Sequence, residues 1–96
     1  IFSRYGGEEF VILLPETSPE SAAEIAGRIR AKIQDSAVRS AGITIRFTAS
    51  FGVYGEPIVA PEQSLSAMID TADKALYEAK NTGRNRVCCA PPENKP

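Results

Sequence analysis

Residues 1–14 read IFSRYGGEEFVILL, two apolar runs joined through Gly6-Gly7. A two-glycine junction between strand-like runs is a strong hairpin signal, because tight hairpin turns need positive φ angles that glycine adopts without steric cost. Glu8 and Glu9 follow directly, although glutamate is depleted in strands and neighbouring carboxylates repel each other. We therefore expect a hairpin whose tip carries two acids beside bare backbone.

This tip has two interpretations. In the structural one, the glycines make a turn and the two glutamates are simply solvated. In the functional one, the glycines leave room for a ligand and expose N–H groups to a phosphate chain, while the carboxylates offer the hard oxygen ligands that Mg²⁺ prefers. Residues 6–10 alone do not decide between them.

Composition limits the classes of function. The 96 residues suggest one modest domain, and a net charge of −1 gives no basic field for nucleic acid. We expect no membrane contact from this segment, which has no membrane-length apolar run and no signal peptide. A histidine-based site within the chain is excluded because histidine is absent. Cys88-Cys89 lacks zinc-site spacing and is expected to lie in a terminal strand.

Helical and strand periodicities alternate after the hairpin. Ser18 and Pro19 predict a helix start, and the apolar stripe that follows predicts a helix from about Pro19 to Ser36. We expect residues 36–42 to form a loop. Period-two alternation over residues 43–54 predicts a strand, with a split into two strands left open.

Further along, Gly52 indicates a bulge or close backbone packing. A second helix is expected to begin near Ser64, with Gly83 at its C-cap, and residues 84–89 to turn back into a final strand. The order of elements predicts an α/β fold (an α+β sandwich) with a single, mainly antiparallel sheet flanked by helices. We expect the domain to occupy residues 1–90 and a polar, proline-rich tail residues 91–96.

Two further stretches extend the pattern of residues 6–10, namely FTASFGV at residues 47–53 and ADKALYEAKNTGRNR at residues 72–86. In this order the chain resembles the GGDEF family, the diguanylate cyclases, in which GGEEF is a common variant of the family motif. The resemblance extends from about Ser3 to Val87. It implies a fold like that of nucleotide cyclases and polymerase palms, of which this chain would be the C-terminal part, truncated on the N-terminal side.

The resemblance implies that the parent protein condenses two GTP molecules into cyclic di-GMP and pyrophosphate with a divalent metal, Mg²⁺ or Mn²⁺. Each copy in a homodimer would present one GTP. By the same resemblance, Glu8 is a metal ligand and catalytic residue, Glu9 is a supporting catalytic residue, and Gly6 and Gly7 let the nucleotide lie against the turn.

The second helix would supply positive charge. The resemblance assigns phosphate contacts to Lys80 and Arg84, and a spacing of one helical turn predicts that both lie on the same side. From the residues alone, the alternative is that both complement the negative end of the helix dipole. Asp73 and Tyr77 are expected to tie this helix to the sheet. Arg28 resembles a position at which some family members bind cyclic di-GMP at an inhibitory, allosteric site.

Several family parts have no counterpart here, including a second metal-binding aspartate and the guanine-binding residues. We therefore expect the 96 residues alone to be inactive, and unpaired strand edges to favour association. The alternative to an enzyme is a receptor module that binds GTP or cyclic di-GMP without catalysis; a scaffold within a larger sensor is the third. The family works in the bacterial cytoplasm, with membrane anchors, where present, in other segments.

Overall fold

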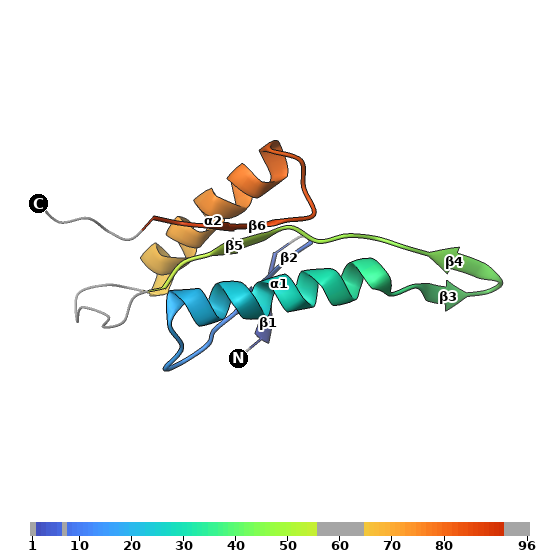
Figure 1. The fold of residues 1–96 in the computed structure, drawn as a ribbon, viewed down its shortest axis with the longest axis horizontal. Helices are drawn as coiled ribbons and strands as arrows, with labels where there is room; N and C mark the ends of the chain where they lie inside the picture. The colour runs from blue at the N-terminus through green and yellow to red at the C-terminus, as the bar shows by residue number, and fades with distance from the viewer. Residues whose placement is uncertain (1, 7, 56–64, 92–96) are drawn as a thin grey trace, which may run out of the picture.

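The computed structural model describes residues 2–6, 8–55 and 65–91. In chain order the elements are β1 (Phe2–Gly6), β2 (Glu9–Ile12), α1 (Pro19–Asp35), β3 (Val38–Ser40), β4 (Ile43–Ile45), β5 (Phe51–Val53), α2 (Leu65–Asn81) and β6 (Val87–Cys89). Both helices pack against the β5–β6 pair, and the β3–β4 hairpin projects beyond the end of α1 (Figure 1). The molecule is accordingly elongated, with extents of 55 × 25 × 23 Å.

The predicted N-terminal hairpin is confirmed, but its turn lies later than expected. β1 and β2 pair antiparallel with Gly6 opposite Glu9, and the register shifts between Arg4 and Gly6. An extra residue on one strand is what a β-bulge introduces. Gly6 therefore ends β1 instead of opening the turn, and Glu8 lies in the turn itself. Gly7 is outside the described residues.

Helix α1 has the limits that its sequence predicts, to within one residue. The Ser18 hydroxyl accepts a hydrogen bond from the Ser21 N–H at 3.1 Å, which satisfies one of the free donors of the first turn. Pro19 occupies the first turn, where a missing N–H costs nothing. The buried face of α1 is narrow, with Ala26 its buried residue, and it packs against β5 and β6.

The loop predicted over residues 36–42 is wrong. Val38–Ser40 pairs with Ile43–Ile45 through a two-residue turn at Ala41-Gly42, whose φ angles of 50° and 79° are those of a type I′ turn. Alanine at the first turn position concealed this hairpin, because such turns favour asparagine, aspartate or glycine there. The strand predicted over residues 43–54 is divided between β4 and β5, the split that its length left open.

The strands form three separate pairs in the described residues, where the sequence predicted a single, mainly antiparallel sheet. β1–β2 and β3–β4 are antiparallel, whereas β5–β6 is parallel. No ladder joins β2 to β5 in the part of the chain that the structure describes. A ladder forms only where two strand backbones lie about 4.8 Å apart. Among the described residues, each strand has such a neighbour only within its own pair. The α/β class, with helices against strands, is confirmed.

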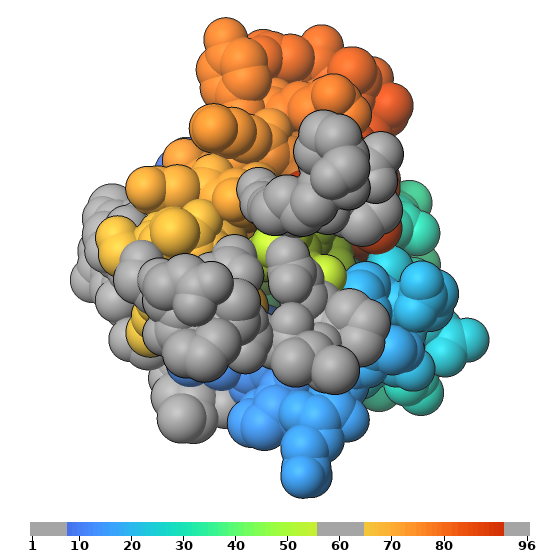
Figure 2. Space-filling view, turned by 90° about the vertical axis from the view of Figure 1, so that its left-hand side faces the viewer, coloured from blue at the N-terminus to red at the C-terminus, as the bar shows by residue number. Residues whose placement is uncertain are grey.

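Gly52 is where α2 approaches β5 most closely. A Cβ atom built on Gly52 would overlap the Ala72 carbonyl oxygen and the Leu76 nitrogen, and would lie 2.8 Å from Leu76 Cα. Close backbone packing, one of the two roles predicted for this glycine, is thus confirmed. Figure 2 shows α1 and α2 on either side of β5, only part of which is visible between them.

The small side chains of α2 make this approach feasible. Ala75 and Ala79 are its buried residues, with exposed fractions of 7% and 0%. Asp73 is exposed and Tyr77 is 70% exposed, so the prediction that they tie the helix to the sheet is wrong. Short residues face β5 because a large side chain would hold the two backbones apart.

The described residues bury few large side chains. The accessible surface is 7224 Å², whereas a compact protein of 10.3 kDa is expected to expose about 5,400 Å². Phe10, Ile12 and Leu14 recur at every second position after the turn and are 55%, 40% and 37% exposed. β2 therefore presents an uncovered apolar face.

Within the described residues, we find no helix with the length and apolar character needed to cross a membrane.

Candidate functional site

One ion pair brings the hairpin tip to the end of α2. Lys80 Nζ lies 3.4 Å from Glu9 Oε2, a contact between residues 71 positions apart. Both side chains are partly exposed, at 29% and 33%, so the pair contributes little to stability. Its significance is spatial: the acidic turn and the basic end of α2, separated in sequence by most of the chain, lie side by side.

The two glutamates of the turn differ in their contacts. Glu9 begins β2 and is paired with Lys80, whereas Glu8 is exposed and makes no ion pair with the described residues. Among those residues, no group of three or more acids or cysteines gathers as a closed metal site. Magnesium in phosphate-transfer sites commonly takes only one or two carboxylates and completes its shell with phosphates and water. Glu8 and Glu9 fit such a partial ligand set.

α2 ends in a turn that carries one of the two hydrogen bonds of a Schellman motif. The Arg84 N–H donates to the Ala79 carbonyl at 2.9 Å, and Gly83 adopts φ 134°. The C-cap prediction for Gly83 is confirmed. Arg84 itself has φ 61° and lies beyond Asn81, the last helical residue. Helical spacing therefore does not extend from Lys80 to Arg84, because the chain has left the helix between them, and the shared side of the two residues stays a prediction.

Asn85 is a residue that the sequence analysis missed. It follows Arg84 with φ 51° and is hydrogen-bonded to Ser50, Arg30 and Gln34, all distant in sequence. The available signal was its residue type, since asparagine is one of the few residues besides glycine that adopt left-handed backbone, and it lies two positions after Gly83.

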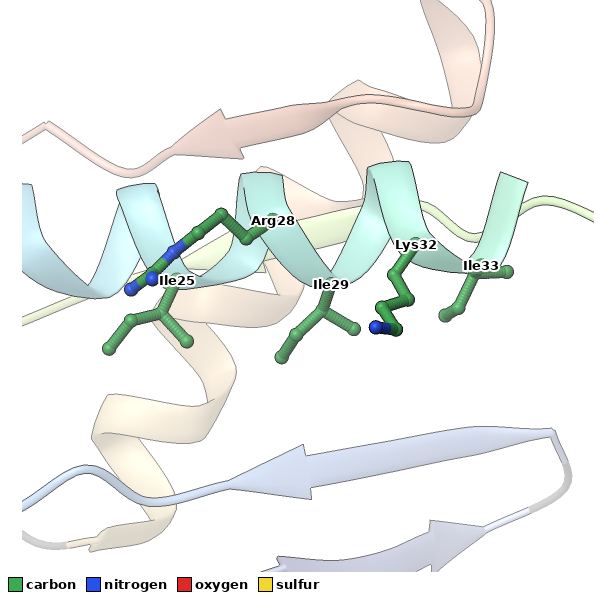
Figure 3. A pocket seen from close by; sticks show the side chains of 5 residues that line it. All are labelled: Ile25, Arg28, Ile29, Lys32 and Ile33. Carbon is green, nitrogen blue, oxygen red and sulfur yellow. The ribbon is translucent and has the colours of Figure 1, made fainter. Parts of the chain in front are cut away.

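Arg28 lies apart from the acidic turn. It lines an open groove along α1, together with Ile25, Ile29, Lys32 and Ile33. Figure 3 shows that all five come from this one helix and that the isoleucines are directed toward the side on which β1 and β2 lie. The groove includes neither Glu9 nor Lys80. The allosteric role of Arg28 stays a prediction, as do the roles of Gly6 and Gly7 toward a nucleotide.

Comparison with known proteins identifies the fold and the lineage. The family model "Diguanylate cyclase, GGDEF domain" matches residues 1–86. Diguanylate cyclase A of Treponema denticola is 41% identical over 87 residues, which cover 88% of this chain and 22% of that protein. Diguanylate cyclase VdcA of Vibrio cholerae is 46% identical, with coverage of 88% and 25%. The chain thus spans about a quarter of the length of these curated relatives.

Comparison with solved structures leads to the same family. Diguanylate cyclase SiaD of Pseudomonas aeruginosa, solved in complex with its activator SiaC, superposes with a TM-score of 0.82 at 36% identity, covering 94% of this chain and 34% of that one. The GGDEF domain of DgcB from Caulobacter crescentus, in complex with c-di-GMP, gives 0.79 at 32% identity, with coverage of 93% and 51%. These similarities confirm the palm-like α/β fold class, and the chain belongs to the GGDEF family of bacterial diguanylate cyclases.

Proposed function

We propose that this chain is the C-terminal part of a catalytic GGDEF domain whose parent protein makes cyclic di-GMP from GTP. The observation that carries the proposal is the Glu9–Lys80 ion pair, which puts the carboxylates of the GGEEF turn beside the basic end of α2. A nucleoside triphosphate needs oxygen ligands for its metal and positive groups for its phosphates, and this corner of the molecule holds both.

The reaction needs no protein nucleophile. The ribose 3′-hydroxyl of one GTP attacks the α-phosphorus of the other. The new O–P bond forms as the bond between the α-phosphorus and the bridging oxygen breaks, the hydroxyl proton passes to water, and pyrophosphate departs with that oxygen. The reciprocal attack closes the ring and releases a second pyrophosphate. A divalent cation, when bound, lowers the hydroxyl pKa and neutralises phosphate charge. The protein's task is positioning and electrostatic stabilisation.

Each site residue has a distinct task in this scheme. Glu8, exposed in the turn and without an ion-pair partner among the described residues, would hold the metal. Glu9 would hold Lys80 at the edge of the site and support the metal. The ammonium of Lys80 and the exposed guanidinium of Arg84 would contact the phosphates.

We also propose that the 96 residues alone do not form cyclic di-GMP. Support comes from the accessible surface of 7224 Å², the uncovered apolar face of β2 and the three strand pairs that stay unconnected among the described residues. The chain also covers only 51% of the DgcB structure, so a comparable part of a whole domain would come from other sequence. Since each domain presents one GTP and the reaction joins two, the working form in this proposal is a homodimer. The proposed place of the reaction is the bacterial cytoplasm.

Metal removal tests the proposed activity. The natural protein, with whatever sequence flanks these residues, is expected to convert GTP to cyclic di-GMP with Mg²⁺ and to lose this activity in EDTA, because the triphosphate charge is then unneutralised. Product is measured by chromatography, with excess Mg²⁺ restoring it as the control. GTP binding without product under every metal condition would favour the receptor alternative. Product from the 96 residues alone would contradict their expected inactivity.

Replacing Lys80 with alanine is expected to raise the KM for GTP about 10-fold or more, because a charge-assisted hydrogen bond to phosphate is lost. Steady-state kinetics of the natural protein measure the change. Lys74→Ala is the matched control, since Lys74 is an exposed lysine of the same helix with no ion pair among the described residues. Equal KM values for the two variants would mean that Lys80 does not contact the nucleotide.

A further inference from the structure

Two consecutive residues after α2 adopt left-handed backbone although neither is glycine. Arg84 has φ 61° and Asn85 has φ 51°. Residues with a Cβ atom populate this region sparsely, and such conformations persist where surrounding contacts impose them. Asparagine accepts the conformation more readily than most residues, but arginine does not. Something other than local preference must therefore hold Arg84.

The contacts that hold this segment converge on the side chain of Asn85. Its Oδ1 accepts a hydrogen bond from Arg30 Nη1 at 2.9 Å, and its Nδ2 donates to Gln34 Oε1 at 3.1 Å. Arg30 Nη1 also donates to Gln34 Oε1 at 2.8 Å, which closes a three-membered network on one turn of α1. Both ends of the Asn85 amide are thus engaged by residues about 50 positions away in sequence.

The backbone on both sides of Asn85 is held as well. The Asn85 N–H donates to Ser50 Oγ at 3.1 Å, and the Arg84 N–H donates to the Ala79 carbonyl at 2.9 Å. The Arg84 carbonyl accepts from Arg86 Nε at 3.2 Å. Every one of these bonds fixes main chain or the Asn85 amide. The Arg84 side chain makes no hydrogen bond or ion pair with the described residues, and it is exposed.

We infer that Asn85 is a positioning residue for Arg84. By docking on Arg30 and Gln34 of α1, it holds the left-handed backbone that directs the Arg84 guanidinium, while leaving that guanidinium free for a ligand. The inference rests on the proposed function, in which the ligand of Arg84 is the triphosphate of GTP. Asn85 itself touches no phosphate in this scheme and acts only through its neighbour.

The test is a double-mutant cycle on GTP affinity in the natural protein, measured as KM and kcat for cyclic di-GMP formation and, independently, by calorimetry with GTP and a metal that does not support turnover. The variants are Asn85→Gly, Arg84→Ala and the double substitution. Glycine is chosen because it adopts left-handed backbone without strain, so the variant removes the amide network while the turn can still form. Asn85→Asp serves as the conservative variant, because a carboxylate oxygen can still accept the Arg30 hydrogen bond.

We expect Asn85→Gly to weaken GTP binding about 10-fold when Arg84 is present, since small misplacements of a binding group are costly. In the Arg84→Ala background the same change should alter binding less than about 2-fold, because the group it positions is gone. Asn85→Asp should recover part of the affinity. An equal loss in both backgrounds, or no loss in either, would overturn the inference while leaving the proposed function standing. Failure of the unaltered protein to bind GTP would instead overturn the proposed function itself, and the inference with it.

Discussion

Replacing Glu8 with glutamine is expected to lower the rate of cyclic di-GMP formation by about 100-fold or more, because the change removes the charged oxygen ligand at nearly constant side-chain size. Glu8 is exposed in the turn and forms no ion pair with the described residues. Its loss should therefore leave the fold unchanged. The measurement is the initial rate of product formation at saturating Mg²⁺, together with the metal concentration that gives half-maximal rate.

Two further substitutions make the Glu8 result interpretable. Glu24→Gln is the matched control, because Glu24 is an exposed glutamate of α1 away from the turn, and it should leave the rate unchanged. Glu9→Gln should lower the rate less than Glu8→Gln and should raise the KM for GTP, since it releases Lys80 from its ion pair. Retention of more than about a tenth of the activity by Glu8→Gln would show that this carboxylate is not a required metal ligand.

Substituting Gly52 with alanine is expected to be the most destabilising single-methyl change in the described part of the chain. The added Cβ would overlap backbone atoms of Ala72 and Leu76, and backbone in a helix cannot move aside as a side chain can. Overpacking of this kind costs about 3 kcal/mol or more. For a domain of this size, that corresponds to a fall in melting temperature of roughly 10–20 °C.

The same substitution in α1 provides the control for Gly52. A Cβ on Gly27 would have no neighbour within 4 Å, and alanine favours helix over glycine by about 1 kcal/mol. Gly27→Ala should therefore raise stability slightly while Gly52→Ala lowers it. Thermal unfolding by circular dichroism, with amide hydrogen exchange of residues 65–81 in the natural protein, measures both. Similar melting temperatures for the two variants would mean that β5 and α2 are not packed as closely as in this structure.

The sequence by itself determined the elements whose signals are local. The Ser18-Pro19 start of α1, the apolar stripe of α2 and the helix-ending Gly83 each act within one or two turns of chain. Their limits could therefore be predicted to within a residue or two. The family motif at residues 6–10 and the similar stretch near the end of α2 likewise indicate the family from the sequence alone. Gly52 indicated either a bulge or close backbone packing, and the sequence decided neither between these two nor which helix would approach.

Only the tertiary structure decided how these parts meet. The bulge near Gly6 moved Glu8 into the turn, and the Glu9–Lys80 ion pair placed that turn beside α2. Asn85, the residue after Arg84, is joined to Arg30 and Gln34 of α1 by hydrogen bonds. The ion pair and the Asn85 hydrogen bonds have no local signature, because each joins residues about 50 or more positions apart along the chain. The bulge depends on how the two strands of the hairpin pair, which the glycines alone do not set. Short-range preferences set the backbone of each element, whereas the site is made by long-range contacts that exist only once the elements have packed.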